Sequence, residues 1–187
     1  FLLLGGKPVL MHTVERFHSF DGSVEIIIVL PAAHHALWKK LCAEYSFSVS
    51  HRVVAGGEER FHSVKAGLEA VADSAGELLP EEMSTGSRKS MNEGSPQAGN
   101  DILVAIHDGV RPLVSHDTIW RCFADAEEFG NAVPFIEPAD SVRVLAGDDS
   151  RPVPRTEVRL IQTPQVFRGS VIMKAYGREY DPAFTDD

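Results

Sequence analysis

The sequence has little cysteine, a shortage of positive charge and no long apolar run. Its two cysteines among 187 residues, Cys42 and Cys122, lie far apart in apolar helical patterns without metal-ligand spacing. We therefore expect reduced, buried thiols in a cytoplasmic protein. No apolar stretch approaches the roughly 20 residues that span a bilayer, and the amino-terminal residues lack signal-peptide features, so we expect no membrane contact.

Several other absences narrow the function. Acidic residues outnumber basic ones by 27 to 18, and the resulting net charge of -9 argues against broad contact with nucleic acid. No H-x-x-x-H pair or G-x-S-x-G elbow occurs, which argues against zinc and against serine acyl transfer. At 187 residues and 43% hydrophobic content, the chain fits a single domain, 1–187, with a substantial core.

One apolar run, residues 102–106, indicates a buried strand that breaks into the polar turn His107–Pro112. Helical and strand-like patterns alternate around it, which predicts an α/β fold with a mostly parallel sheet flanked by helices. The expected helices begin at Pro8, Ala36, Ser115 and Ser170, and a further helix with Val64, Leu68 and Val71 follows the break at residues 56–60. The expected further strands are 24–30, 47–53 and 132–136.

Two segments depart from this alternation. Residues 73–100 are rich in Ser, Gly, Glu and Asn, and we interpret them as a mobile insertion. Residues 138–160 predict a β-hairpin arm, with strands 140–145 and 153–160 about a polar turn, and an exposed ribbon of this kind normally needs a partner. Because the chain starts at Phe1 and stops at Asp187 without a helix end, we expect a missing piece at each end.

Polar clusters follow three of the expected strands. The clusters are residues 56–63, residues 107–111, and residues 140–143 together with Arg155 and Thr163. The carboxylate of Asp108 beside arginines and hydroxyls suits a magnesium-bound phosphate substrate. The alternative is that Asp108 only bonds its own turn, and for His107 a structural imidazole is favoured over a general base.

Together these residues resemble the 2-C-methyl-D-erythritol 4-phosphate cytidylyltransferase family. The resemblance runs through five motifs in order and covers nearly all of the chain except residues 73–100. The motifs are Gly56-Gly57-Glu58-Glu59-Arg60-x-x-Ser63, His107-Asp108-Gly109-Val110-Arg111-Pro112, Pro138-x-Asp140-Ser141, Thr163-Pro164-Gln165 and Thr185-Asp186.

The resemblance implies a Rossmann-like nucleotidyltransferase fold, Mg²⁺ as cofactor and a homodimer joined through the hairpin arm. It implies transfer of a cytidylyl group from CTP to the polyol phosphate. Gly57, Glu58, Ser63 and Asp108 would bind the nucleotide, and Arg111, Ser141, Arg155 and Thr163 would bind the sugar phosphate. Asp108, Arg111 and Arg155 would be catalytic, with Asp108 the candidate magnesium ligand, directly or indirectly.

The sequence departs from the family pattern at Glu58, Ser141 and Arg143, where Asp, Thr and Lys are usual. The family's cationic segments would lie before Phe1 and after Asp187, so we expect this polypeptide as written to be impaired. Two alternatives stay open: a ribitol 5-phosphate cytidylyltransferase, and a non-catalytic nucleotide-binding dimer module.

Overall fold

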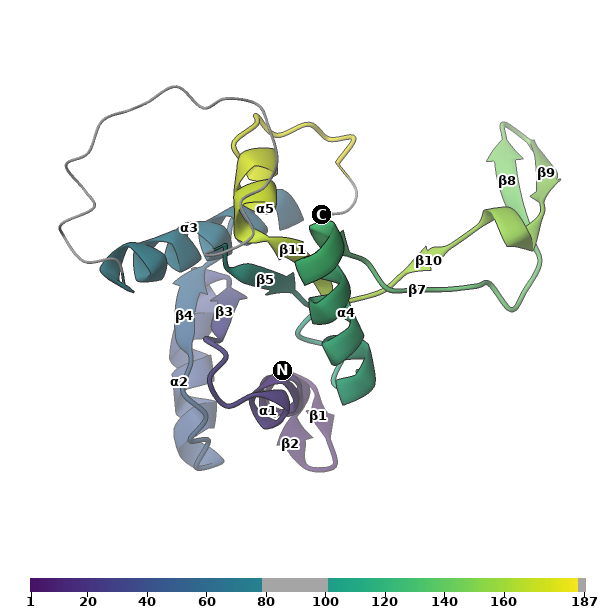
Figure 1. Ribbon diagram of the computed structural model, residues 1–187. Helices are drawn as coiled ribbons and strands as arrows, with labels where there is room; N and C mark the ends of the chain where they lie inside the picture. The colour runs from purple at the N-terminus through teal and green to yellow at the C-terminus, as the bar shows by residue number, and fades with distance from the viewer. Residues whose placement is uncertain (79–100, 185–187) are drawn as a thin grey trace, which may run out of the picture.

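The computed structural model of the protein describes residues 1–78 and 101–184 (Figure 1). The helices are α1 (Val9–Phe20), α2 (His35–Glu44), α3 (Arg60–Leu78), α4 (His116–Phe129) and α5 (Gly169–Tyr176), with 3-10 turns η1 (Ala32–His34) and η3 (Arg155–Glu157). The strands are β1 (Leu3–Leu4), β2 (Lys7–Pro8), β3 (Ile27–Leu30), β4 (Arg52–Ala55), β5 (Leu103–Ile106), β6 (Asn131–Ala132), β7 (Phe135–Ile136), β8 (Val142–Ala146), β9 (Asp149–Val153), β10 (Leu160–Ile161) and β11 (Gln165–Arg168).

The strands form small mixed sheets. β3 and β4 pair in parallel, with Ile28 opposite Val53. β11 lies between β5 and β6 and is antiparallel to both, so that Val166 faces Ala105 on one side and Ala132 on the other. The α/β class is confirmed, but the expected mostly parallel sheet is not. An apolar run such as residues 102–106 reports burial on both faces and carries no information on strand direction.

The helices cover these sheets with apolar faces. Met11 of α1 and Trp38 of α2 are almost fully buried against Ile28 of β3. Ala126 of α4 packs on Val166, and Ile172 of α5 packs with Leu68 of α3. Each large apolar side chain buried in this way contributes about 1.5–3 kcal/mol.

Helix α4 shows how local signals set the ends of an element. Ser115 is its N-cap, and the Ser115 hydroxyl accepts a hydrogen bond from the Thr118 amide at 3.0 Å. Gly130 ends the helix in the left-handed region, with φ 94°. Both expectations for this helix are confirmed.

The hairpin is present, but its strands differ from those expected. β8 pairs with β9 about the turn at Gly147, and β7 pairs with β10 to form the base of the arm. The predicted second strand, 153–160, is wrong, because the β9 ladder ends at Val153 and η3 follows after Pro154. Figure 1 shows this arm, residues 135–161, projecting away from the other elements.

Three other boundaries also differ from expectation. β4 begins only at Arg52, and the strand expected at 132–136 is divided into β6 and β7 around Pro134, which cannot donate to a ladder. Helix α3 continues to Leu78, so residues 73–78 are helical rather than part of an insertion. The remainder of that expected insertion, 79–100, lies outside the described residues. Within the described ranges, no helix is long and apolar enough to cross a membrane.

Candidate functional site

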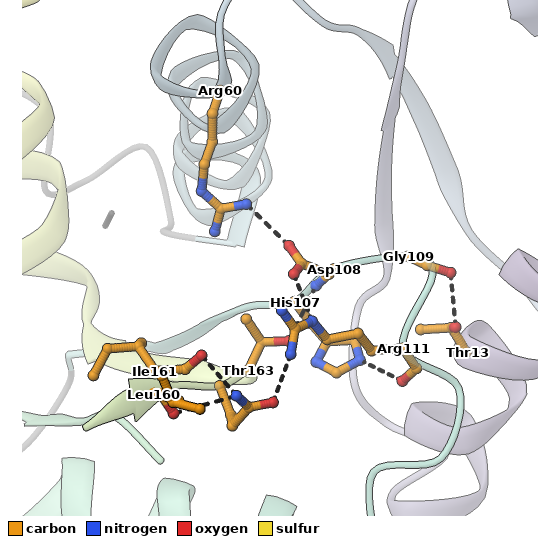
Figure 2. Close-up of polar contacts among 10 residues, drawn as sticks. Thr13, Arg60, His107, Asp108, Gly109, Arg111, Leu160, Ile161 and Thr163 are labelled. Carbon is orange, nitrogen blue, oxygen red and sulfur yellow. Dashed lines mark hydrogen bonds and ion pairs between the residues drawn. The ribbon is translucent and has the colours of Figure 1, made fainter. Parts of the chain in front are cut away.

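The polar turn after β5 carries the best-defined cluster of functional groups. Asp108 follows the last residues of the strand, and the Arg111 amide donates to the Asp108 carbonyl at 3.0 Å, which closes the turn. Figure 2 shows the Asp108 carboxylate between two arginine side chains that come from different parts of the chain. The turn therefore presents a carboxylate and cations together at the end of β5.

Both arginines make ion pairs with Asp108. Arg60 Nη1 lies 3.0 Å from Asp108 Oδ1, and Arg111 Nε lies 2.8 Å from Oδ2. The Asp108 side chain is 26% exposed, while those of Arg60 and Arg111 are 41% and 43% exposed. The three side chains carry a net charge of about +1 and remain open to solvent, which suits binding of an anion.

The turn is held in place from below by α1. The Thr13 hydroxyl, on a buried residue of α1, donates to the Gly109 carbonyl at 2.9 Å. An added Cβ at Gly109 would lie 2.8 Å from Leu10 Cδ1, so glycine permits this close approach of the turn to the helix. On the other side, the Asp108 amide donates to Thr163 Oγ1 at 3.3 Å.

Arg111 makes a second contact with the segment between β10 and β11. Its Nη1 donates to Gln162 Oε1 at 2.6 Å. The backbone carbonyl of Arg111 in turn accepts from His107 Nε2 at 3.0 Å. The Asp108 turn is thus tied at its side chains and at its backbone.

His107 supports the turn from inside the protein. Its ring lies edge-on to Phe17, with 4.9 Å between the ring centroids. Burial lowers the pKa of His107 below its ordinary value of 6.5, although the hydrogen bond to Arg111 opposes this shift. A neutral ring that donates through Nε2 fits the structural role expected for His107.

The glycine-rich loop lies at the start of α3. Ser63 Oγ donates to the Gly57 carbonyl at 3.4 Å, and an added Cβ at Gly57 would lie only 2.3 Å from His62 Cβ. Glu58 is exposed on this loop. Phe61 stacks on Tyr176 with 4.8 Å between centroids, which anchors the first turn of α3 against α5. The loop and Arg60 are therefore fixed next to each other.

The site residues predicted on the arm, Arg155 and Ser141, do not join the cluster around Asp108. Arg155, in η3, donates to the Ala139 carbonyl at 2.6 Å, and Ser141 is exposed just before β8. Arg143 donates across the hairpin to the Ser150 hydroxyl and carbonyl at 2.8 and 2.7 Å. The described structure brings Thr163, Asp108 and Arg111 together, but it leaves Arg155 and Ser141 on the arm.

Two contact residues were missed as site residues. Arg60 stood in the glycine-loop motif, yet only the structure shows that it pairs with Asp108. Gln162 directly precedes Thr163, and apart from this position no sequence pattern indicated that it contacts the site. Side-chain contacts between residues 48 and 51 positions apart, as for these two, leave no local pattern.

A metal ion held by the protein alone needs several ligand groups placed close together. In residues 1–78 and 101–184, no group of three or more His, Cys, Asp and Glu side chains is placed to hold a metal ion. Both carboxylate oxygens of Asp108 already accept from arginines. One such carboxylate fits a Mg²⁺ ion that is held mainly by substrate phosphates and water, and it does not form a metal cage by itself.

Comparison with known proteins supplies the class and the family. The sequence profile described as "IspD: 2-C-methyl-D-erythritol 4-phosphate cytidylyltransferase" matches residues 1–80 and 85–187. The match is interrupted only at 81–84, so the expectation that 73–100 falls outside the resemblance is wrong. A protein of that name from Bacteroides thetaiotaomicron is 43% identical over 187 residues, which cover 100% of this chain and 73% of the relative.

Solved structures with similar folds carry names of the same enzyme. The 2-C-methyl-D-erythritol 4-phosphate cytidylyltransferase of Thermus thermophilus superposes with a TM-score of 0.66 at 26% identity, covering 97% of this chain and 73% of the other. A 4-diphosphocytidyl-2C-methyl-D-erythritol synthase from Anaerococcus prevotii, at 24% identity, shares the fold with a TM-score of 0.72, covering 100% and 71%. The fold and the named relatives are those of a nucleotidyltransferase enzyme. The chain belongs to the 2-C-methyl-D-erythritol 4-phosphate cytidylyltransferase family.

Proposed function

We propose that the protein transfers a cytidylyl group from CTP to 2-C-methyl-D-erythritol 4-phosphate and releases pyrophosphate. The observation that carries this proposal is the solvent-open Arg60–Asp108–Arg111 arrangement in a chain of this family. A phosphate oxygen of the acceptor attacks the α-phosphorus of CTP in line, and pyrophosphate leaves. Because a phosphate monoester is largely ionised near neutral pH, positioning and charge neutralisation do most of the work.

The nucleotide side of the site is assigned to the loop before α3. Gly57, Glu58 and Ser63 contact the cytidine in this proposal, supported by the close folding of the loop against His62. Asp108 and Arg111 lie at the junction of nucleotide and acceptor. Thr163, which accepts from the Asp108 amide, belongs to the acceptor side.

Mg²⁺ is the proposed cofactor. When bound, it would neutralise triphosphate charge and polarise the α-phosphate. Asp108 is the residue that would hold it, through water rather than directly, because its two oxygens are engaged by arginines. Arg60 and Arg111 then keep the Asp108 carboxylate oriented toward the phosphates.

A homodimer through the arm completes the proposed site. The arm exposes Leu145, Phe135 and Ile136 at 80%, 52% and 54%, which is apolar surface suited to burial against a second copy. Arg155 and Ser141 stand on this arm, so a neighbouring copy can receive them as ligands for the acceptor. Arg155 has a planar, permanent charge that suits bidentate contact with a phosphate.

Complementation tests the shared site. Arg155→Ala and Asp108→Asn chains are each expected to lose most activity as homodimers. Mixed dimers contain one site with both residues intact, so subunit exchange should restore turnover. Mixtures that exchange subunits, as followed by native mass spectrometry, but stay inactive would place Arg155 and Asp108 in the site of one chain.

Acceptor choice tests the function itself. We expect CTP-dependent pyrophosphate release with 2-C-methyl-D-erythritol 4-phosphate and much less with ribitol 5-phosphate, because the family profile and the named relatives carry the former name. The ribitol alternative and the non-catalytic module are accordingly not favoured. Preference for ribitol 5-phosphate, or nucleotide binding without turnover of either acceptor, would contradict the proposal.

A cytoplasmic location is also part of the proposal. Cys42 and Cys122 both carry free thiols, and burial raises the pKa of each. Such thiols are poor nucleophiles and are typical of a reducing compartment.

A further inference from the structure

Gln162 occupies the connection between the arm and the sheet that carries the site. β10 ends at Ile161 and β11 begins at Gln165, so residues 162–164 form this connection. The backbone amide of Gln162 donates to the carbonyl of Pro134, the residue just before β7, at 2.8 Å, which fixes Gln162 beside the start of the arm. The position of the Gln162 side chain therefore depends on the position of the arm base.

The two ends of the Gln162 amide contact different structures. Its nitrogen donates to the carbonyls of Leu160 and Ile161 at 3.2 and 2.9 Å. Its oxygen accepts from Arg111 Nη1 at 2.6 Å. Figure 2 shows Leu160 and Ile161 on one side of this contact and Arg111 on the other. An amide is suited to this bridge because it carries both a donor and an acceptor.

The geometry of Arg111 explains why a second contact matters. Asp108 binds Arg111 at Nε only, and one contact leaves a planar guanidinium free to tilt about that point. The contact from Nη1 to Gln162 adds a second fixed point, and two points define the orientation of the plane. Among the described residues, Arg111 Nη2 donates to no protein acceptor, and the side chain is partly exposed to solvent.

Resting on the function proposed above, we propose that Gln162 is a positioning residue that orients Arg111 toward the acceptor phosphate. Through its contacts with Leu160 and Ile161, Gln162 also couples the orientation of Arg111 to the position of the arm base. Gln162 itself touches neither substrate. Loss of its side chain leaves Arg111 paired with Asp108 but no longer fixed in plane. The affinity for the acceptor should then fall, while the affinity for CTP, whose assigned loop lies before α3, changes little.

The test uses three variants of the full-length protein. Gln162→Met keeps the chain length and removes both polar ends. Gln162→Glu keeps an acceptor for Arg111 and removes the donors to Leu160 and Ile161. Arg159→Met is the matched control, because Arg159 lies at the arm base, over the Phe135 ring at 4.9 Å, and within residues 1–78 and 101–184 it makes no hydrogen bond or ion pair with the Asp108 turn.

Steady-state kinetics give the first readout. Gln162→Met should raise the KM for the acceptor about tenfold, the size expected for one hydrogen bond to a charged group, with the KM for CTP nearly unchanged. Gln162→Glu should restore most of that loss, and Arg159→Met should show none. An unchanged acceptor KM in Gln162→Met, or an equal increase in Arg159→Met, would overturn the proposal.

The second readout does not depend on turnover. The Arg111 Nε proton, followed by nitrogen-15 NMR, should exchange with water at a higher rate in Gln162→Met than in the wild type or in Arg159→Met. If the wild type turns over no acceptor while this difference is present, the proposed function fails and the positioning of Arg111 stands. If turnover is present and the difference is absent, the positioning role fails alone.

Discussion

Asp108→Asn is the substitution that best separates a catalytic from a structural role at the turn. The change keeps the size of the side chain and does not alter the backbone amide that donates to Thr163. It removes the charge that pairs with Arg60 at 3.0 Å and Arg111 at 2.8 Å. The NH₂ group of the new Asn cannot accept a hydrogen bond, so one of the two arginines loses its acceptor at residue 108.

The stability cost should be modest because all three side chains are partly exposed. Exposed ion pairs contribute about 0.2–1 kcal/mol each, so the two pairs together contribute about 0.4–2 kcal/mol. For a protein of this size, about 2–4 °C of melting temperature corresponds to 1 kcal/mol, which predicts a decrease of about 1–8 °C. Differential scanning fluorimetry measures this shift.

The catalytic cost should be far larger. Removing one oriented charged group from the transition state typically costs about 100-fold or more in turnover. Pyrophosphate release from CTP with the acceptor measures this loss. If turnover stays within about threefold of wild type while the protein melts lower, Asp108 only holds its own turn, and its catalytic assignment is wrong.

Asp101→Asn provides the matched control for this experiment. Asp101 accepts from the Ser170 amide at 3.0 Å, at the start of α5 and away from the site. The same chemical change there should lower the melting temperature by a comparable amount and leave turnover intact. A loss of turnover in both variants would show that the assay reports stability.

Three further predictions concern the loop, the buried imidazole and the arm. Gly57→Ala should weaken CTP binding measured by calorimetry, because the added Cβ would lie 2.3 Å from His62 Cβ, whereas Gly22→Ala, with 3.6 Å of clearance, should not. Because burial lowers the folded-state pKa of His107, the stability that depends on its neutral ring is present above about pH 6.5 and is lost as the pH falls below that value. A His107→Gln variant keeps the hydrogen-bond donor but does not titrate, so its melting temperature should fall less steeply below pH 6.5 than that of the wild type. Leu145→Asp should weaken self-association in sedimentation experiments, because the Leu145 side chain is 80% exposed on the arm; an unchanged dimer would exclude this surface.

Local signals in the sequence predicted much of the fold. The cap at Ser115, the glycine at Gly130 and the apolar run 102–106 each act within one element, and each appears where expected. Relations between elements were less accessible. The antiparallel pairing of β11 with β5 depends on how the chain returns from the arm, which no short window of residues records.

The candidate site shows the same division. Asp108 and Arg111 lie three residues apart, so their pairing follows from the turn. The contacts of Arg60 and Gln162 with that turn depend on the packing of α3 and of the arm base. Helix α3 also extends beyond its expected end, because single Ser and Gly residues of weak helix propensity do not stop a helix that has already formed.

The arginine pair on Asp108 has an electrostatic consequence at longer range. It creates a small positive patch on a protein whose formal net charge is -9. A polyanionic nucleotide is therefore repelled at a distance by the net charge and attracted close to the turn. The Debye length is about 8 Å at physiological ionic strength, so moderate salt screens the distant repulsion more than the direct contacts. The rate of nucleotide capture should accordingly rise with salt before affinity falls, and acidic substitutions far from the turn should slow capture without altering the chemical step.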